Sequence, residues 1–155
     1  MESEQKYKLF YSLLILFCLI GLGTMIYLPL ELSNIVPNSC NINSFLSCGT
    51  VANSGYSHYF GVPVYAYGWV FFSLMLVLSL LDYFMKDRPM KRFLVYFLLV
   101  FGVSGAIAAS YLIYTELAKI GAICPMCTIA QICIFSIAGL SLYLFAKNYK
   151  QTFTS

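Results

Sequence analysis

The sequence predicts an all-α integral membrane protein, a four-helix bundle with a long extracytoplasmic loop between the first and second helices. Three observations support this. The 155-residue chain is 61% hydrophobic and 10% charged, far more apolar than a soluble domain of this size can bury. It contains four runs long enough to cross a bilayer. Its Lys and Arg residues are divided unevenly among the connecting segments. We expect residues 1–155 to form a single membrane domain.

The expected spans are free of charged residues and hold 20 or more residues each. A helix needs about 20 residues to cross the hydrocarbon layer. The first run is longer than the core of a typical signal peptide, and no small-residue cleavage site follows it, so we expect a span there. The spans are predicted at about 9–30, 62–81, 93–115 and 124–146, and the uncharged stretch before the last one reaches back to Ile120.

The positive charges predict the orientation, because Lys and Arg tend to stay on the cytoplasmic side of a membrane. With a cytoplasmic N-terminus, the outer segments carry only Lys119. Both termini are then cytoplasmic, and loop 31–61 and turn 116–123 lie outside. The net charge of +3 therefore indicates topology, not nucleic-acid binding. The inner segments carry Lys6, Lys8, Lys86, Arg88, Lys91, Arg92, Lys147 and Lys150.

Four of the six cysteines fall on the outer side, where disulfides persist. Cys40 and Cys48 lie in the long loop with seven residues between them. The segment Cys124-Pro125-Met126-Cys127 lies at the outer mouth of the fourth span. The other two, Cys18 and Cys133, lie within spans, where buried cysteines usually behave as small apolar residues.

The Cys-Pro-Met-Cys segment has the features of a redox site. Pro125 suits the first turn of a helix, where a missing N–H costs nothing, so the helix should begin close to Cys124. Residues three apart share a helix face, and the sulfurs of Cys124 and Cys127 can therefore meet in a disulfide. The free N–H groups and the dipole of a helix N-terminus favour a thiolate, the nucleophilic form of cysteine.

Two structural alternatives remain open for these cysteines. The four could bind zinc, although the gap between Cys40 and Cys48 fits the usual ligand spacing poorly. The loop pair could also be a static staple, a common role of extracellular cysteines. Because a redox pair is expected beside it, we favour a relay between the two pairs and predict no metal site.

This arrangement resembles the vitamin K epoxide reductase family and its prokaryotic homologues over essentially the whole membrane core. Cys40 and Cys48 have the family spacing and precede a Cys-x-x-Cys segment at the head of span four. Ser54 stands where the family carries a serine near its quinone site. Residues 60–68 look like the microbial version of the loop that re-enters the bundle, and Tyr111–Leu112 resembles the wall of the family's pocket.

The resemblance implies a mechanism and its partners. A thioredoxin-like protein of the DsbA type would give two electrons to Cys40–Cys48. This pair would reduce Cys124–Cys127 through a mixed disulfide, and Cys127 would reduce a quinone of the ubiquinone, menaquinone or vitamin K type. We expect the chain to lack the fused thioredoxin-like domain of many microbial members, and its partner to be a separate protein. The expected catalytic residues are the four cysteines, and the expected quinone contacts are Ser54, Phe71, Phe72, Leu112, Met126 and Gln131.

Each expected contact also has a simpler interpretation. The side chains within the spans also fit ordinary bundle packing, and a loop serine is usually a turn residue. His58 lies among aromatic residues that are typical of the membrane interface, and we interpret it as an anchor and not as a proton carrier.

The resemblance leaves the substrate open. Gln131 stands four residues after Cys127, where the vertebrate enzymes carry a tyrosine. This favours a simple quinone over vitamin K epoxide as acceptor. We therefore expect a multi-pass protein of the cell membrane that supports disulfide-bond formation. The alternatives are vitamin K epoxide or quinone reduction as the main activity, and a non-catalytic scaffold with a stapled loop.

Overall fold

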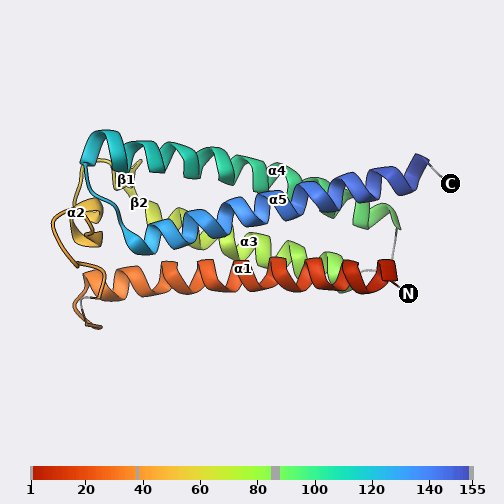
Figure 1. Cartoon of the computed structure of the whole chain (residues 1–155), viewed down its shortest axis with the longest axis horizontal. Coiled ribbons are helices and arrows are strands. Elements are labelled where there is room, and N and C mark those ends of the chain that lie inside the picture. The colour runs from red at the N-terminus through yellow and green to blue at the C-terminus, as the bar shows by residue number, and fades with distance from the viewer. Residues whose placement is uncertain (1, 38, 85–87, 154–155) are drawn as a thin grey trace.

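A computed structural model describes residues 2–37, 39–84 and 88–153 and shows a bundle of long helices (Figure 1). Four of the described helices are long and apolar enough to cross a membrane. The predicted all-α membrane bundle is therefore confirmed; that residues 1–155 form one domain stays a prediction. The long helices are α1 (Glu2–Leu32), α3 (Val64–Phe84), α4 (Arg88–Thr115) and α5 (Pro125–Phe153).

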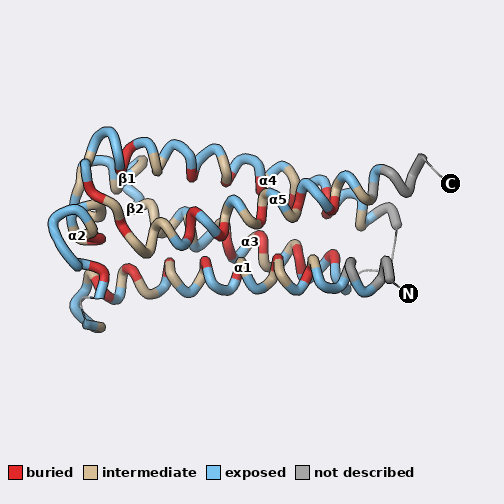
Figure 2. The backbone as a smooth tube through the Cα atoms, in the orientation of Figure 1, coloured by how far each residue is buried: buried red, intermediate tan, exposed pale blue. Residues whose placement is uncertain are grey.

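The long helices pack side by side, and the loop between α1 and α3 lies at the end of the bundle opposite the two termini (Figure 1). Helix α1 packs against α3 and α5, and α4 packs against α5 and α3. The start of α1 and the end of α5 lie at the same end of the bundle, and the long loop lies at the other (Figure 1). Outward-facing apolar side chains such as Val70 and Ile107, with 68% and 67% of their surface exposed, suit contact with lipid. Figure 2 shows this division between buried and exposed positions along each helix.

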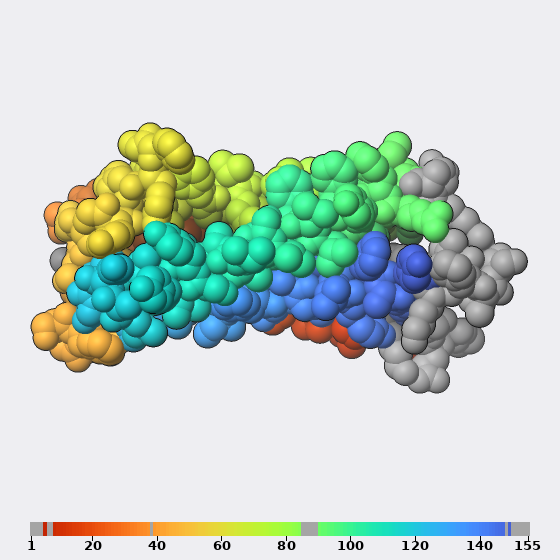
Figure 3. All heavy atoms as spheres, turned by 90° about the horizontal axis from the view of Figure 1, so that it is seen from above, coloured from red at the N-terminus to blue at the C-terminus, as the bar shows by residue number. Residues whose placement is uncertain are grey.

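The loop between α1 and α3 contains more structure than predicted. It holds the short helix α2 (Cys48–Ala52) and a hairpin of β1 (His58–Tyr59) and β2 (Val62–Pro63). Phe60 and Gly61 connect the two strands with φ angles of 52° and 78°, as a two-residue hairpin turn with two left-handed positions requires. The surrounding residues form the yellow mound at one end of the molecule in Figure 3.

The hairpin also corrects the predicted start of the second span. Val62 and Pro63 belong to strand β2, and α3 begins only at Val64. The backbone N–H of Val64 donates to the carbonyl of Ser57 (2.9 Å), which ties the base of the hairpin to the head of α3. The segment 60–68 therefore divides between a hairpin turn, a strand and a helix.

The predicted turn over 116–123 is wrong for its first five residues. They continue α4 as a π-helix, η1 (Glu116–Ile120), in which the N–H of Gly121 donates to the carbonyl of Glu116 (2.9 Å). Gly121 then ends the helix in the left-handed conformation, with φ of 69°. Helix α5 begins at Pro125, which confirms the start expected from the proline; the apolar stretch from Ile120 to Cys124 is not part of it.

Apolar side chains fill the middle of the bundle, and Cys18 and Cys133 are buried among them. The sequence predicts this buried, apolar environment for both cysteines. Towards the end that holds the termini, the hydroxyl of Tyr11 on α1 donates to the carboxylate of Asp82 on α3. Both residues are fully buried, so this bond joins two helices inside the core. The largest apolar members of the core are Tyr11, Leu14, Phe72, Met75, Leu98, Ile137 and Leu144.

Candidate redox site

The two loop cysteines are joined. Cys40 and Cys48 form a disulfide with a Cα–Cα distance of 5.6 Å, within the usual range for such bonds. Each has 1% of its surface exposed. The backbone N–H of Cys40 donates to Oε1 of Glu31 (2.7 Å) at the end of α1. This bond fixes one half of the disulfide to the bundle.

The other half is fixed by the start of α2. Cys48 is the first residue of this helix, and the Ser47 hydroxyl before it accepts the N–H of Thr50 (3.2 Å) as an N-cap. Oδ1 of Asn41 accepts the hydroxyl of Ser47 (2.8 Å) and the N–H of Gly49 (3.0 Å). The residues around the disulfide therefore hold its geometry through their own side chains.

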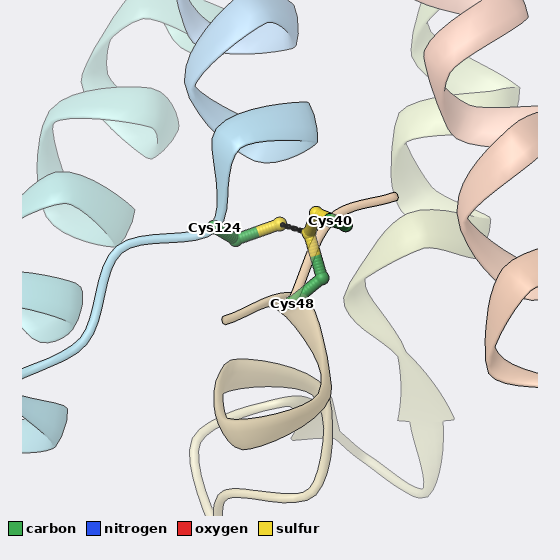
Figure 4. A group of neighbouring side chains, drawn as sticks. All are labelled: Cys40, Cys48 and Cys124. Atoms are coloured by element: carbon green, nitrogen blue, oxygen red, sulfur yellow. Dashed lines mark hydrogen bonds between the residues drawn. A yellow bond between two sulfur atoms is a disulfide. The ribbon is translucent and has the colours of Figure 1, made fainter. Parts of the chain in front are cut away.

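Cys124 meets this disulfide from the other side. Its Sγ lies 3.0 Å from Sγ of Cys48, and Figure 4 shows its sulfur pointing from the segment before α5 towards the disulfide. A short parallel bridge holds the two segments together: the N–H of Ile123 donates to the carbonyl of Phe45 (2.8 Å), and the N–H of Ser47 donates to the carbonyl of Ile123 (3.1 Å). The contact between the cysteines is thus set by the backbone.

Cys124 and Cys127 are free thiols at the N-terminus of α5. The backbone N–H of Cys127 donates to Sγ of Cys124 (3.2 Å). A donor here suits a sulfur that carries negative charge during thiol–disulfide exchange. Exchange between Cys124 and Cys48 needs only the sulfurs already in contact. It forms a Cys48–Cys124 bond and releases Cys40.

The zinc alternative involves the same atoms. The sulfurs of Cys40, Cys48 and Cys124 all lie within 4.8 Å of one another, close enough for a common metal ion. Two of them are bonded to each other in the disulfide, whereas a zinc ligand must be a thiolate. The arrangement in this structure is therefore that of a disulfide beside a thiol.

A cavity of about 500 Å³ opens beside the cysteines. Its walls come from all four long helices, from α2 and from the hairpin, and Cys48, Cys124 and Cys127 all line it. The walls are mostly apolar with a few polar groups, as a site for a flat apolar ring requires. Of the six predicted quinone contacts, five line this cavity: Ser54, Phe71, Phe72, Leu112 and Gln131.

Met126, the sixth predicted contact, does not line the cavity. It packs instead against the buried cluster of Leu28, Cys40, Cys48 and Cys124. The physical reason is its position directly before Cys127, which lines the cavity from α5, because adjacent residues on a helix do not face the same way. The structure therefore places Met126 against this cluster and not in the cavity wall.

The two polar residues among the predicted contacts already have partners. The hydroxyl of Ser54 donates to the carbonyl of Val51 (2.7 Å), so it must rotate before it donates to a ligand. The side-chain amide of Gln131 donates to Oε1 of Glu116 (3.1 Å), and both side chains are buried. Glu116 also lines the cavity.

Sequence reasoning did not single out Glu31, Glu116 or a cavity position for His58. Both glutamates are buried and directly follow predicted spans, and a buried acid at the end of an apolar run is a signal of function. Oε2 of Glu31 is buried without a hydrogen-bond partner among the described residues. His58 lines the cavity from β1, and its Nδ1 shares a hydrogen bond with the hydroxyl of Ser57 (2.8 Å).

Comparison with known proteins identifies the family. A search of curated proteins finds no match to this chain. A model of the vitamin K epoxide reductase family matches residues 12–142, which include all four long helices in whole or in part and both cysteine pairs. The chain therefore belongs to the vitamin K epoxide reductase family, whose members are membrane oxidoreductases that act on thiols, disulfides and quinones.

Proposed function

We propose that this protein is a quinone-dependent thiol–disulfide oxidoreductase that oxidises a separate thioredoxin-like partner and so supports disulfide-bond formation. The observation that carries the proposal is the 3.0 Å contact between Sγ of Cys48 and Sγ of Cys124, beside a cavity that Cys127 lines. It links a loop disulfide to a helix thiol and the helix thiols to a site of suitable shape for a quinone.

In the first step, the dithiol of a DsbA-type protein reduces the Cys40–Cys48 disulfide. The attack falls on the sulfur of Cys40, because the sulfur of Cys48 faces Cys124. The partner leaves oxidised, with two electrons transferred and two thiols formed in the loop. Both loop cysteines are buried, so the loop must open at Cys40 to admit the partner.

In the second step, the thiolate of Cys48 attacks the Cys124–Cys127 disulfide at Cys124. A Cys48–Cys124 bond forms and the sulfur of Cys127 leaves. The thiolate of Cys40 then attacks Cys48, which restores the loop disulfide and leaves Cys124 and Cys127 as thiols. A disulfide at Cys40–Cys48 beside thiols at Cys124 and Cys127 is the arrangement in this structure.

In the last step, the helix dithiol reduces a quinone bound in the cavity. The aromatic rings of Phe71 and Phe72 and the side chain of Leu112 supply flat apolar walls. Ser54 and Gln131 supply the polar groups there. The acceptor is a quinone of the ubiquinone, menaquinone or vitamin K type, which leaves as a quinol after taking up two electrons and two protons.

The distribution of Lys and Arg supports an extracytoplasmic position for the redox cysteines, with both chain termini in the cytoplasm. An oxidised loop is stable in such a compartment. The main competing function, reduction of vitamin K epoxide, is less favoured, because the position of the vertebrate tyrosine holds Gln131, whose amide is bonded to Glu116.

Reconstitution tests the proposal. Purified protein in lipid nanodiscs is supplied with a ubiquinone or menaquinone analogue and a reduced thioredoxin-like protein. Quinol should form together with oxidised partner in a one-to-one ratio, and Cys124→Ala should abolish it, while Cys133→Ala should not. If no quinol forms with either quinone and the oxidation state of the cysteines does not respond to quinone, the protein is a scaffold with a stapled loop.

A further inference from the structure

Glu116 is a buried acid that the steps above do not use. It has 6% of its surface exposed and lines the cavity together with Cys124 and Cys127. Its neighbours along η1, Leu117 and Lys119, are exposed. A buried carboxyl at the end of a membrane helix is costly and usually has a function.

The surroundings of this carboxyl place it beside the head of α5, where Cys124 and Cys127 lie. Its Oε1 accepts the side-chain amide of Gln131 (3.1 Å), and the carboxyl also interacts with the backbone N–H of Cys124. It is close enough to Cys127 for an electrostatic interaction with that thiol. The described residues that line the cavity include no Lys or Arg, so no cation in the wall neutralises the acid.

The backbone conformation at the end of α4 sets the position of Glu116. It is the first residue of the π-helical turn η1, and its carbonyl accepts the N–H of Gly121 (2.9 Å), five residues later. Such turns are rare and occur frequently at functional sites, where they redirect side chains. Here the turn ends α4 with the acid facing the head of α5.

We propose that Glu116 is the acid–base residue of the quinone-reducing step, an inference that rests on the proposed function. Each thiol proton passes to the Glu116 carboxylate as its sulfur gives up electrons, and from the carboxyl to a quinone oxygen. In total two S–H bonds break, the Cys124–Cys127 bond forms, and the quinone gains two electrons and two protons. Gln131 is a positioning residue that holds the carboxyl in place.

The apolar surroundings of the sulfurs explain why quinone reduction needs an acid–base residue. A site of low dielectric does not stabilise a thiolate beside an oxygen that gains negative charge unless a proton moves with the electrons. Glu116 is an acid that lines the cavity, lies close to the Cys127 thiol and interacts with the backbone N–H of Cys124. His58 also lines the wall, but it lies on the hairpin, is exposed and is bonded to Ser57.

The test measures the two half-reactions separately in Glu116→Gln, which keeps the size of the side chain and one acceptor oxygen but cannot carry a proton. After reduction by dithiothreitol and its removal, the single-turnover rate of quinol formation should fall at least about 100-fold, the usual contribution of general acid–base catalysis. Exchange between the loop and helix cysteines should stay at the wild-type rate. Alkylation and mass spectrometry measure this rate. The matched control is Asp82→Asn, a buried carboxyl outside the cavity, and it should form quinol as the wild type does.

A second variant covers the case in which Glu116→Gln does not fold. Glu116→Ala leaves room for a small acid, and formate should restore quinol formation at least about tenfold by resupplying a proton carrier. A wild-type rate of quinol formation in Glu116→Gln, an equal loss in Asp82→Asn, or no restoration by formate would overturn the inference. If the wild-type protein itself forms no quinol, the proposed function fails, and this inference with it.

Discussion

The Sγ atoms of Cys48 and Cys124 lie 3.0 Å apart, although the two cysteines are 76 positions apart along the chain. The contact joins the head of α2 to the segment before α5. It predicts that the variant Cys40→Ser/Cys127→Ser, in which Cys48 and Cys124 keep their sulfurs, forms a disulfide between them on mild oxidation. Peptide mass spectrometry detects this bond. The matched variant Cys40→Ser/Cys124→Ser should not form the corresponding Cys48–Cys127 bond, and similar yields in both would show that the contact has no selectivity.

The backbone bridge should control the rate of exchange between the pairs. Ile123→Pro removes the N–H that donates to the carbonyl of Phe45 (2.8 Å). The two sulfurs then lose part of their alignment, and loop–helix exchange should slow about tenfold, since small displacements of reacting groups have large effects on rate. Rapid alkylation at timed intervals measures this. Ile123→Ala keeps the N–H and should exchange at the wild-type rate; equal slowing in both variants would assign the effect to the side chain.

Cys18 and Cys133 should be dispensable for turnover. Both are buried among the apolar side chains of the bundle, and neither lines the cavity. Cys18→Ala and Cys133→Ala should keep quinol formation near the wild-type rate, with a loss of about 1 kcal/mol in the free energy of unfolding from the small space left behind. Steady-state quinol formation and thermal unfolding measure the two effects. A large loss of activity in either variant would reveal a working thiol outside the two pairs.

The bond between Tyr11 and Asp82 should stabilise the fold without affecting the chemistry. Tyr11→Phe removes the hydroxyl that donates to this buried carboxylate. An acceptor left without its donor costs about 1–3 kcal/mol, so the midpoint of thermal unfolding should fall. Tyr83→Phe, at an exposed ring that contacts Tyr11, is the control and should unfold as the wild type does. Tyr11→Phe should form quinol at the wild-type rate, which would show that the bond acts on stability alone. An unchanged midpoint of thermal unfolding in Tyr11→Phe would contradict the prediction.

Most of the bundle could be predicted because its helices are set by local sequence. Long uncharged runs specify membrane helices through their length and composition alone, and Pro125 marks the start of α5 through the geometry of its ring. The cysteine pattern identified both pairs and the end of the bundle at which they lie. The family match is in agreement with this pattern.

The remaining features depend on long-range contacts or on local conformations that periodicity does not reveal. Val62 and Pro63 continue an apolar run, and only the turn at Phe60 and Gly61 shows that they pair in a hairpin. The contact between Cys48 and Cys124 depends on a bridge between distant segments. The sequence predicts a turn that begins at Glu116, because a charged residue ends an apolar run whether or not the helix continues.

The position of the Met126 side chain is another feature that the sequence does not predict. Cys124 and Cys127, which lie close to it in sequence, both line the cavity, whereas Met126 packs against the cluster of Leu28, Cys40, Cys48 and Cys124. Proximity in sequence predicts that Met126 lies near the cysteines, but not which face of the helix it occupies. The phase of a helix in its first turn depends on where it begins, which is the least certain part of an assignment from sequence.

The relay from Cys40–Cys48 to Cys124–Cys127 is the central claim, and Cys40→Ser tests it through two rates of quinol formation. The first uses a small membrane-permeant dithiol as reductant, and the second uses a reduced thioredoxin-like protein. Because a small dithiol can reach Cys124 and Cys127 directly, the first rate should stay near that of the wild type. A folded protein needs the loop pair to pass its electrons on, so the second rate should collapse. Equal losses with both reductants would show that the loop disulfide is structural and would contradict the relay.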